Sequence, residues 1–221
     1  YQMKMNMLAT GVYAKTHGLS LSSGIPEERM RAVNGCKRNI DYAASMGCGI
    51  IIGFLKGGPG SDREVSERLF LESMLELKPY IEEKKVQVLI EATNHKEASI
   101  IRTLKEGAHV INFLDCPFIQ LLADTYHMNI EEPSLVDSLS EYMNYYPHLH
   151  ISDDNRAYPG LGSLDFTAIY RKLMECGYKG TVAVEGNIQH GLLEDTQICA
   201  AYLHKVCSGL HTPSRVPSHA V

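Results

Sequence analysis

The sequence predicts an α/β fold in which parallel strands are covered by helices. Two observations lead to this prediction. Six short apolar segments of strand character alternate with segments of helical character along the 221 residues. The last four strand segments also each bring a carboxylate or an imidazole to their carboxyl end. Regular alternation of strand and helix is typical of βα units, whose strands run parallel in one sheet.

The strand segments are short runs rich in Val, Ile and Leu with partial two-residue alternation. We expect strands at residues 7–14, 47–55, 86–93, 119–125, 148–152 and 181–186.

Three of the intervening helices have recognisable start signals, and two also have a glycine stop. The first starts at Pro26 and stops at Gly47, and the second, over residues 63–81, is preceded by a capping box of Ser61 and Glu64. The third starts at the cap Asp165 and stops at Gly177.

The ends of the last four strands decide between an open sheet and a closed barrel. Side chains alternate along a strand, so Glu91 shares a face with Gln87 and Leu89, away from the apolar side that meets the helices. The equivalent positions on the next strands are Asp124, His150 and Glu185. They follow one another at roughly the length of one βα unit, about 30 residues, which places them at the same height. In a barrel they converge at the carboxyl-end rim, where active sites of that fold lie, so convergence favours a TIM-type (β/α)8 barrel.

Three carboxylates gathered at one rim predict a bound cation. Without one they would repel each other and some would take up protons. An oxygen-rich set with a single imidazole suits Mn²⁺, Mg²⁺ or Co²⁺ better than Zn²⁺. The six cysteines contain no C-x-x-C pair, which argues against a thiolate zinc site or a redox dithiol. We therefore expect one divalent metal ion, with Mn²⁺ as the first choice.

Four segments of the sequence resemble a known family. They are "LIEATNHKE", "LLADTYHMNIEE", "HLHISDDNRAYPGLGSLDF" and "VAVEG". They are similar to the sugar isomerase/epimerase superfamily with the xylose isomerase-like TIM barrel, and most similar to its tagatose and psicose (allulose) 3-epimerases. The similarity spans residues 86–190 and extends more weakly over the two earlier strands.

The resemblance also implies a domain organisation. Eight βα units are expected where only six are counted, so we expect this chain to lack the first two units. Residues 1–208 are predicted to form the incomplete barrel and residues 209–221 a flexible tail. The first 15 residues are expected to be affected most, because they border the open side.

The resemblance implies roles for seven residues. Metal ligands are Glu91, Asp124, His150 and Glu185; Glu91 and Glu185 also transfer the proton; Glu97, His127 and Arg156 hold the substrate's carbonyl and hydroxyl oxygens. One departure is Asp153, where the sugar epimerases commonly carry a Glu. That difference leaves the substrate open.

The same residues have structural interpretations that remain open at this point. These are Asp124 as a turn cap, His127 as a hydrogen-bonded turn histidine, Glu97 as the partner of Asn94 in a capping box for "KEASIIRTLKEG", and Arg156 as a surface partner of Asp153 or Asp154. His148 lies one layer below His150 and is expected to be a hydrogen-bonded core residue. "KGGPG" at 56–60 is interpreted as a loop rather than a nucleotide site.

The resemblance implies an isomerase that acts on keto sugars. We expect C3 epimerisation through a metal-stabilised cis-enediolate, with two glutamates as acid and base. Alternatives on the same scaffold are an aldose–ketose or hydroxypyruvate-type isomerase and a 3-keto-glycoside epimerase. A non-catalytic sugar-binding protein is the non-enzymatic alternative. An abasic-site endonuclease is disfavoured, because it needs more histidine ligands and a basic groove.

Charge and hydropathy restrict the partners. A net charge of −5 without basic blocks argues against nucleic acid and anionic lipid. No apolar run approaches the roughly 18 residues of a membrane span, and the first residues lack a secretion-signal pattern. We expect a cytoplasmic protein with a small-molecule keto sugar substrate. The resemblance further implies a homo-oligomer, either a dimer or a tetramer.

Overall fold

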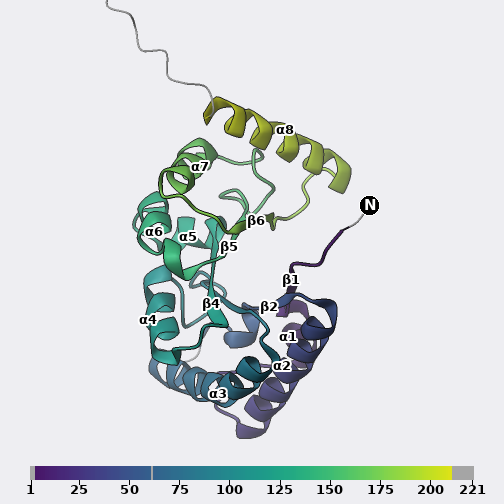
Figure 1. Cartoon of the computed structure of the whole chain (residues 1–221), viewed down its shortest axis with the longest axis vertical. Helices are drawn as coiled ribbons and strands as arrows, with labels where there is room; N and C mark the ends of the chain where they lie inside the picture. The colour runs from purple at the N-terminus through teal and green to yellow at the C-terminus, as the bar shows by residue number, and fades with distance from the viewer. Residues whose placement is uncertain (1–2, 61, 211–221) are drawn as a thin grey trace, which may run out of the picture.

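The computed structural model describes residues 3–60 and 62–210. Six parallel strands form one curved sheet in the order of the sequence, and the helices form an arc outside it (Figure 1). The strands are β1 (Met7–Ala9), β2 (Gly49–Ile52), β3 (Val88–Glu91), β4 (Ile119–Asp124), β5 (His148–Ile151) and β6 (Thr181–Val184). The α/β fold and the six parallel strands are confirmed, and the sheet is part of a TIM barrel.

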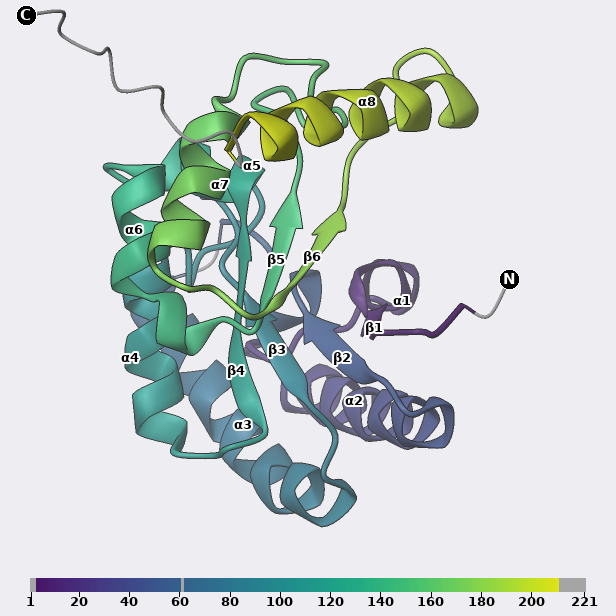
Figure 2. The same ribbon diagram turned by 45° about the horizontal axis from the view of Figure 1, so that its top comes forward.

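The helices follow the strands in the expected alternation. They are α1 (Gly11–His17), α2 (Pro26–Met46), α3 (Arg63–Lys84), α4 (Leu104–Leu114), α5 (Thr125–Glu131), α6 (Leu135–Glu141), α7 (Phe166–Glu175) and α8 (Leu192–Leu210), with single 3₁₀ turns η1 (Phe54–Lys56) and η2 (Met143–Tyr145). Figure 2 shows α4, α6 and α7 along the outer face of β4 and β5, with α2 and α3 beside β2 and β3. None of the helices in the described part of the chain is long and apolar enough to cross a membrane.

The inner face of the sheet is layered. At the bottom, Gln87 Nε2 donates to Gln120 Oε1 at 3.1 Å across β3 and β4. Above them the side chains of Ile51, Leu89 and Leu122 form a separate small apolar cluster. The next inward positions along β3 and β4 are Glu91 and Asp124, so the alternation within each strand lifts the acidic groups to the rim. The main apolar core lies on the other face, against the helices.

The first strand is shorter than predicted. Residues 7–14 were expected to be one strand, but β1 ends at Ala9 and α1 begins at Gly11. Thr10 closes the strand by donating from its backbone N and its Oγ1 to the carbonyl of Ile51. Its own carbonyl accepts the first helical bond, from Ala14 N. β1 pairs only with β2, so a longer extended segment would have had ladder bonds on one side alone.

The predicted helix ends are partly confirmed. Pro26 opens α2, and Gly47 closes it in the left-handed conformation. Asp165 caps α7 by accepting from Ala168 N at 3.0 Å, and the helix ends at Glu175 with Gly177 as its stop, since Gly177 has a left-handed φ of 69° and donates to the carbonyl of Met174. The cap of α3 is Asp62, whose Oδ1 accepts from Val65 N. Ser61, the predicted cap, lies outside the described residues.

The proposed capping box of Asn94 and Glu97 is wrong. No helix starts there, because Asn94 uses its backbone carbonyl and its Oδ1 to close a short turn over residues 94–98. The next helix, α4, begins only at Leu104, where Thr103 Oγ1 accepts from Glu106 N.

The two outer strands approach each other at one end without pairing. Asn6 Nδ2 donates to Thr181 Oγ1 at 3.3 Å, which connects the residue before β1 to the start of β6. The side chains of β6 are largely exposed, unlike those of the four central strands. At the other end of the chain α8 runs to Leu210, two residues beyond the predicted barrel boundary; the rest of the predicted tail, 211–221, lies outside the described residues.

Candidate metal centre

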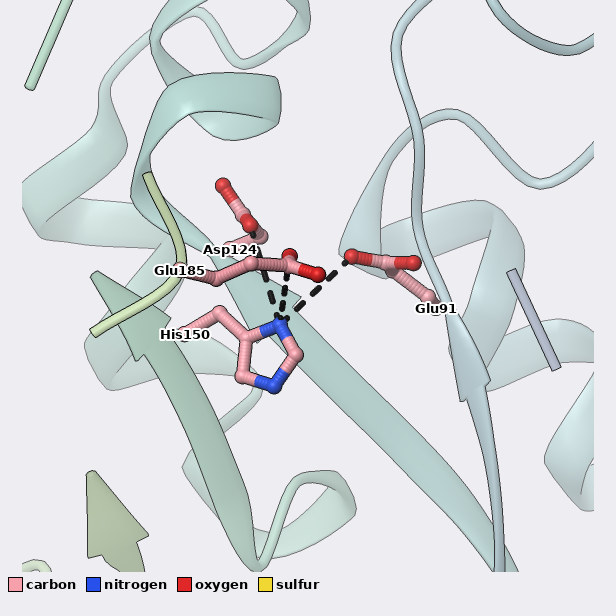
Figure 3. A group of neighbouring side chains, drawn as sticks. All are labelled: Glu91, Asp124, His150 and Glu185. Carbon is pink, nitrogen blue, oxygen red and sulfur yellow. Dashed lines mark hydrogen bonds and ion pairs between the residues drawn. The ribbon is translucent and has the colours of Figure 1, made fainter. Parts of the chain in front are cut away.

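Four side chains from neighbouring strands meet at the carboxyl-end rim (Figure 3). Glu91 ends β3, Asp124 ends β4, His150 lies near the end of β5, and Glu185 follows β6 directly. One possible ligand atom from each residue can be chosen so that all four lie within 4.8 Å of one another. The sheet register brings them together, since Asp124 is paired with His150 across β4 and β5. The structure thus brings together the four predicted metal ligands.

The imidazole of His150 lies at the centre of the group. Its Nδ1 is 2.8 Å from Glu185 Oε2, 3.8 Å from Glu91 Oε1 and 3.9 Å from Asp124 Oδ2 (Figure 3). Glu91 Oε1 is buried and has no hydrogen-bond partner in the described part of the structure. A buried carboxylate oxygen without a donor is costly, and a cation would satisfy it. Together, the three carboxylates and the imidazole of this group fit a hard divalent cation.

The surroundings shift the pKa values of the three carboxyl groups in different directions. Burial, reinforced by the charges of Asp124 and Glu185, raises the pKa of Glu91 to about 8. Burial also raises the pKa of Asp124 to about 6, although Arg156 opposes the shift. For Glu185, burial is outweighed by the hydrogen bond to His150 and by nearby positive charge, and its pKa falls to about 2. Without a cation, one glutamate is therefore protonated and the other ionised at neutral pH.

Arg156 forms hydrogen bonds to two of the four candidate ligands. Its guanidinium donates from Nη1 to Asp124 Oδ2 at 2.8 Å and from Nη2 to Glu185 Oε2 at 2.9 Å. It also lies over the ring of Tyr126, 4.9 Å from the centroid. The alternative surface pairing with Asp153 or Asp154 is therefore not the arrangement in the structure.

Asp153 explains how Arg156 reaches the site. The Asp153 carboxylate accepts backbone hydrogen bonds from Gly160, Gly162 and Leu164, which folds the loop after β5 onto itself. At the turn of this loop Arg156 adopts a positive φ of 64°, a conformation that a non-glycine residue rarely takes. The folded loop thus directs the Arg156 side chain toward the strand ends.

His127 lies on α5 beside Glu91. It is buried, and its Nδ1 accepts from the backbone N of Asn94 at 3.2 Å, with Asn94 Nδ2 a further 2.8 Å contact. Since Nδ1 accepts, the neutral ring carries its proton on Nε2, which lies 3.9 Å from Glu91 Oε1. Burial and the charges of Arg156 and Lys56 lower the pKa of His127 to about 3, so the ring is neutral. It is positioned as a hydrogen-bond donor at the edge of the metal group.

The structure also tests the structural interpretations of Asp124, His148 and Glu97. Asp124 also caps α5, since its Oδ1 accepts from Tyr126 N and His127 N, so it has a structural role in addition to its place in the metal group. His148 is buried and bonded to Thr181 Oγ1, as expected for a core residue. Glu97 is exposed on the turn after β3, and it is not part of the metal group.

Sequence reasoning missed Lys56. It ends the 3₁₀ turn after β2, its side chain is fully buried, and its Nζ donates to Thr93 Oγ1, two residues beyond Glu91. Burial lowers the pKa of Lys56 to about 8, against the charges of Glu91 and Glu97. Treating "KGGPG" as a loop was correct for its glycines but overlooked the lysine, which ends the 3₁₀ turn four residues after β2.

Gly53, also after β2, leaves room for the glutamate. A Cβ at this position would lie 2.3 Å from Glu91 Oε2, closer than any real contact. A larger residue at this position would therefore require the Glu91 carboxylate to move from its place in the metal group.

A curved parallel sheet with a largely buried set of acidic and imidazole side chains at its carboxyl edge defines an α/β barrel protein with a candidate divalent-metal centre. The chain belongs to the family described as xylose isomerase-like TIM barrel, which matches residues 2–200. The resemblance seen in the sequence is thereby confirmed.

Named relatives are epimerases. The chain is 37% identical over 102 residues to a 3-dehydro-D-guloside 4-epimerase of Escherichia coli K12, covering 46% of this chain and 39% of the relative. It is 26% identical over 197 residues to a D-psicose 3-epimerase of Enterocloster bolteae, covering 86% and 65%. The chain therefore spans less than two thirds of the length of these relatives.

The fold is shared with solved structures. The apo crystal structure of a 3-keto-D-glucoside 4-epimerase from E. coli has a TM-score of 0.79 at 24% identity, covering 93% of this chain and 80% of that one. At this identity the similarity establishes the fold alone.

Proposed function

We propose that this protein is a divalent-metal-dependent epimerase of keto sugars that inverts C3 through an enediolate. The observation that carries the proposal is the four-residue group at the rim, in which two glutamates from the ends of β3 and β6 lie together with Asp124 and His150. Epimerisation beside a ketone needs one carboxylate that can accept a proton and another that can donate one. The names of the two relatives support the reaction class.

The cation would be held by Glu91, Asp124, His150 and Glu185. When bound, it would supply electrostatic stabilisation for negative charge on the substrate's carbonyl oxygen. We propose Mn²⁺ as the native ion, with Mg²⁺ or Co²⁺ as alternatives and Zn²⁺ less suited, because the set is rich in oxygen and contains one imidazole.

The protein's own groups would move the proton and hold the sugar. One of Glu91 and Glu185 takes the proton from the carbon beside the ketone, while the other returns a proton to the opposite face; the roles exchange in the reverse direction. The Nε2–H of His127 and the guanidinium of Arg156 would bind neighbouring substrate oxygens. Glu97 would contribute only if substrate binding brings its exposed carboxylate to the rim.

The proposal is tested by proton NMR in D₂O. Fructose, psicose, tagatose and ribulose are incubated with the protein and Mn²⁺, and we expect deuterium at C3 together with the C3 epimer. EDTA should stop both. Glu185→Gln should nearly abolish exchange, whereas Glu194→Gln, a matched change at an exposed position on α8, should leave it unchanged. Substantial exchange in Glu185→Gln would contradict the two-glutamate assignment.

A second candidate is 4-epimerisation of a 3-keto-glycoside. It is favoured by the name of the relative with 37% identity and by Asp153, where the ketose 3-epimerases commonly carry a Glu. Deuterium at C4 of a 3-keto-glycoside, with none at C3 of the free ketoses, would select it. Label at C1 or C2 with an aldose product would instead indicate an aldose–ketose isomerase. Metal binding without exchange into any sugar would favour a sugar-binding role.

We further propose that the protein is cytoplasmic, and, on the resemblance, that it is a homo-oligomer, a dimer or a tetramer. Sedimentation velocity across a concentration series tests the oligomeric state.

A further inference from the structure

Lys56 is a buried cation beside the metal group. Its side chain is 0% exposed, and the hydrogen bond from Nζ to Thr93 Oγ1 accounts for one of the three N–H donors of an ammonium group. Its charge acts on Glu91 and on His127, so it lies within electrostatic reach of both sides of the β3 end.

No carboxylate neutralises this cation directly. Among the residues that the structure describes, Lys56 forms no ion pair within 4.0 Å, and its hydrogen-bond partner Thr93 is neutral. Two carboxylates act on it by charge without forming an ion pair: Glu91, which belongs to the metal group, and Glu97, whose exposed position lets solvent screen the interaction. A fully buried ammonium without a close counter-charge is costly, and proteins retain such groups mainly at functional sites.

Lys56 and Arg156 flank the ligands from opposite sides. Arg156 binds Asp124 and Glu185, at the ends of β4 and β6, whereas Lys56 follows β2 and bonds to Thr93, beyond the end of β3. Three ionised carboxylates would be balanced by a divalent cation and Arg156. Lys56 therefore adds a positive charge that the described ligands do not require, near the β3 end, whereas the hydrogen bonds of Arg156 go to Asp124 and Glu185.

We propose that Lys56 binds an anionic substituent of the substrate, a carboxylate or a phosphate, and that this protein prefers acidic keto sugars to neutral ones. The inference rests on the proposed function for the position of the sugar at the rim, and it adds the class of substrate. The ammonium would hold the charged end of the sugar while the ketone end occupies the four-ligand group.

The test compares three ligands that differ only at C6. Fructose, fructuronate and fructose 6-phosphate carry a hydroxymethyl, a carboxylate and a phosphate there. Dissociation constants are measured by ligand-observed NMR titration of the Mg²⁺-loaded chain, with free Mg²⁺ held constant. We expect at least one anionic ligand to bind about 10 to 100 times more tightly than fructose, as for a charge-assisted hydrogen bond. The better of the two distinguishes a carboxylate from a phosphate.

Variants of Lys56 test whether its positive charge causes the preference for anionic ligands. Lys56→Met should reduce the preference to within about threefold while changing the affinity for fructose little, and Lys56→Arg should retain part of it. Lys96→Met removes an exposed lysine of the neighbouring turn and should keep the preference. Circular dichroism checks folding, and Lys56→Gln replaces Lys56→Met if the latter does not fold.

Three results would overturn the inference. They are equal binding of all three ligands by the unmodified chain, an intact preference in Lys56→Met, and an equal loss in Lys96→Met. Exchange of solvent deuterium is measured on the same samples. Anion preference without exchange would overturn the proposed function and leave the Lys56 assignment standing, whereas exchange into fructose without anion preference would do the reverse.

Discussion

At the scale of single residues, Glu91 is held in a site that does not suit its charge. The residue is 8% exposed, one of its carboxylate oxygens lacks a hydrogen-bond partner among the described residues, and its pKa rises from 4.5 to about 8. The folded chain therefore binds a proton there that the unfolded chain releases between these pH values. Because the unfolded state binds fewer protons in that range, the stability of the metal-free chain falls as pH rises from about 4.5 to about 8.

Glu91→Gln should therefore stabilise the metal-free chain at pH 8 and weaken metal binding. We expect the free energy of unfolding to rise by about 1 to 3 kcal/mol at pH 8, with a smaller change at pH 5. Urea unfolding in EDTA at the two pH values measures it. A variant that is less stable than the parent chain at pH 8 would show that the Glu91 charge is not the cause.

The same proton predicts the pH dependence of metal binding. A carboxylate must be ionised to ligate a cation, so binding of Mn²⁺ releases the Glu91 proton below about pH 8. The affinity should rise about tenfold per pH unit up to pH 8 and then level off. Toward lower pH the slope should steepen, because two further ligands bind protons: His150, whose pKa lies above its ordinary value despite burial because Glu185, Glu91 and Asp124 surround it, and Asp124, with a pKa of about 6. Titration calorimetry in two buffers of different ionisation enthalpy counts the protons, and a count near zero at pH 7 would contradict the prediction.

Arg156→Lys should affect the substrate more than the metal. A lysine retains the charge but cannot reproduce the two-pronged contact with Asp124 and Glu185. We expect the KM for the sugar to rise about tenfold, while the Mn²⁺ affinity changes less than about threefold. Lys172→Arg, at a half-buried position on α7, serves as the control. A loss of metal affinity equal to the rise in KM would assign Arg156 to holding the metal ligands alone.

The juxtaposition of the four candidate ligands could be predicted from the sequence, because strand alternation and βα spacing determine both their face and their height. The position of Glu97 depends instead on the turn that Asn94 makes when it bonds to His127, 33 residues away. Lys56 was missed for a related reason. Its burial against Thr93 depends on how closely the β2 and β3 ends approach, which Gly53 permits but the local pattern does not indicate.

At the scale of elements, the loop after β5 is the part most dependent on one side chain. Asp153→Asn should lower the free energy of unfolding by about 1 to 3 kcal/mol, because an amide offers one acceptor oxygen for backbone donors that now share two. Amide hydrogen exchange should speed up at Gly160, Gly162 and Leu164. Asp137→Asn, on an exposed face of α6, is the matched control. Unchanged exchange at these three amides would show that the loop is held by other contacts.

Elements were predictable where local signals and tertiary contacts agree. The helix from Pro26 has a proline start and a glycine stop, and the structure keeps both. In contrast, residues 10–14 have the composition of a strand, but Thr10 turns the chain by bonding to Ile51, a contact between elements that no local pattern contains.

At the scale of the whole molecule, the metal group connects four strands. Its candidate ligands extend from Glu91 at the end of β3 to Glu185 after β6. A single bound ion would therefore link four of the six described strands. The outer strands are joined less firmly, with the contact between Asn6 and Thr181 at their near ends. The resistance of the described fold to unfolding should therefore depend strongly on bound metal.

Addition of Mn²⁺ should raise the melting temperature of the entire chain. At a free concentration one hundred times the dissociation constant, binding contributes about 2.7 kcal/mol, which corresponds to about 5 to 11 °C for a domain of this size. Scanning calorimetry with Mn²⁺ and with EDTA measures the shift, and a single shifted transition is expected because the ligands span four strands. His150→Gln should remove most of the shift, whereas His109→Gln, at an exposed position on α4, should retain it. An equal shift in both variants would mean that Mn²⁺ binds elsewhere, and a second, unshifted transition would mean that the strands outside the metal group unfold independently.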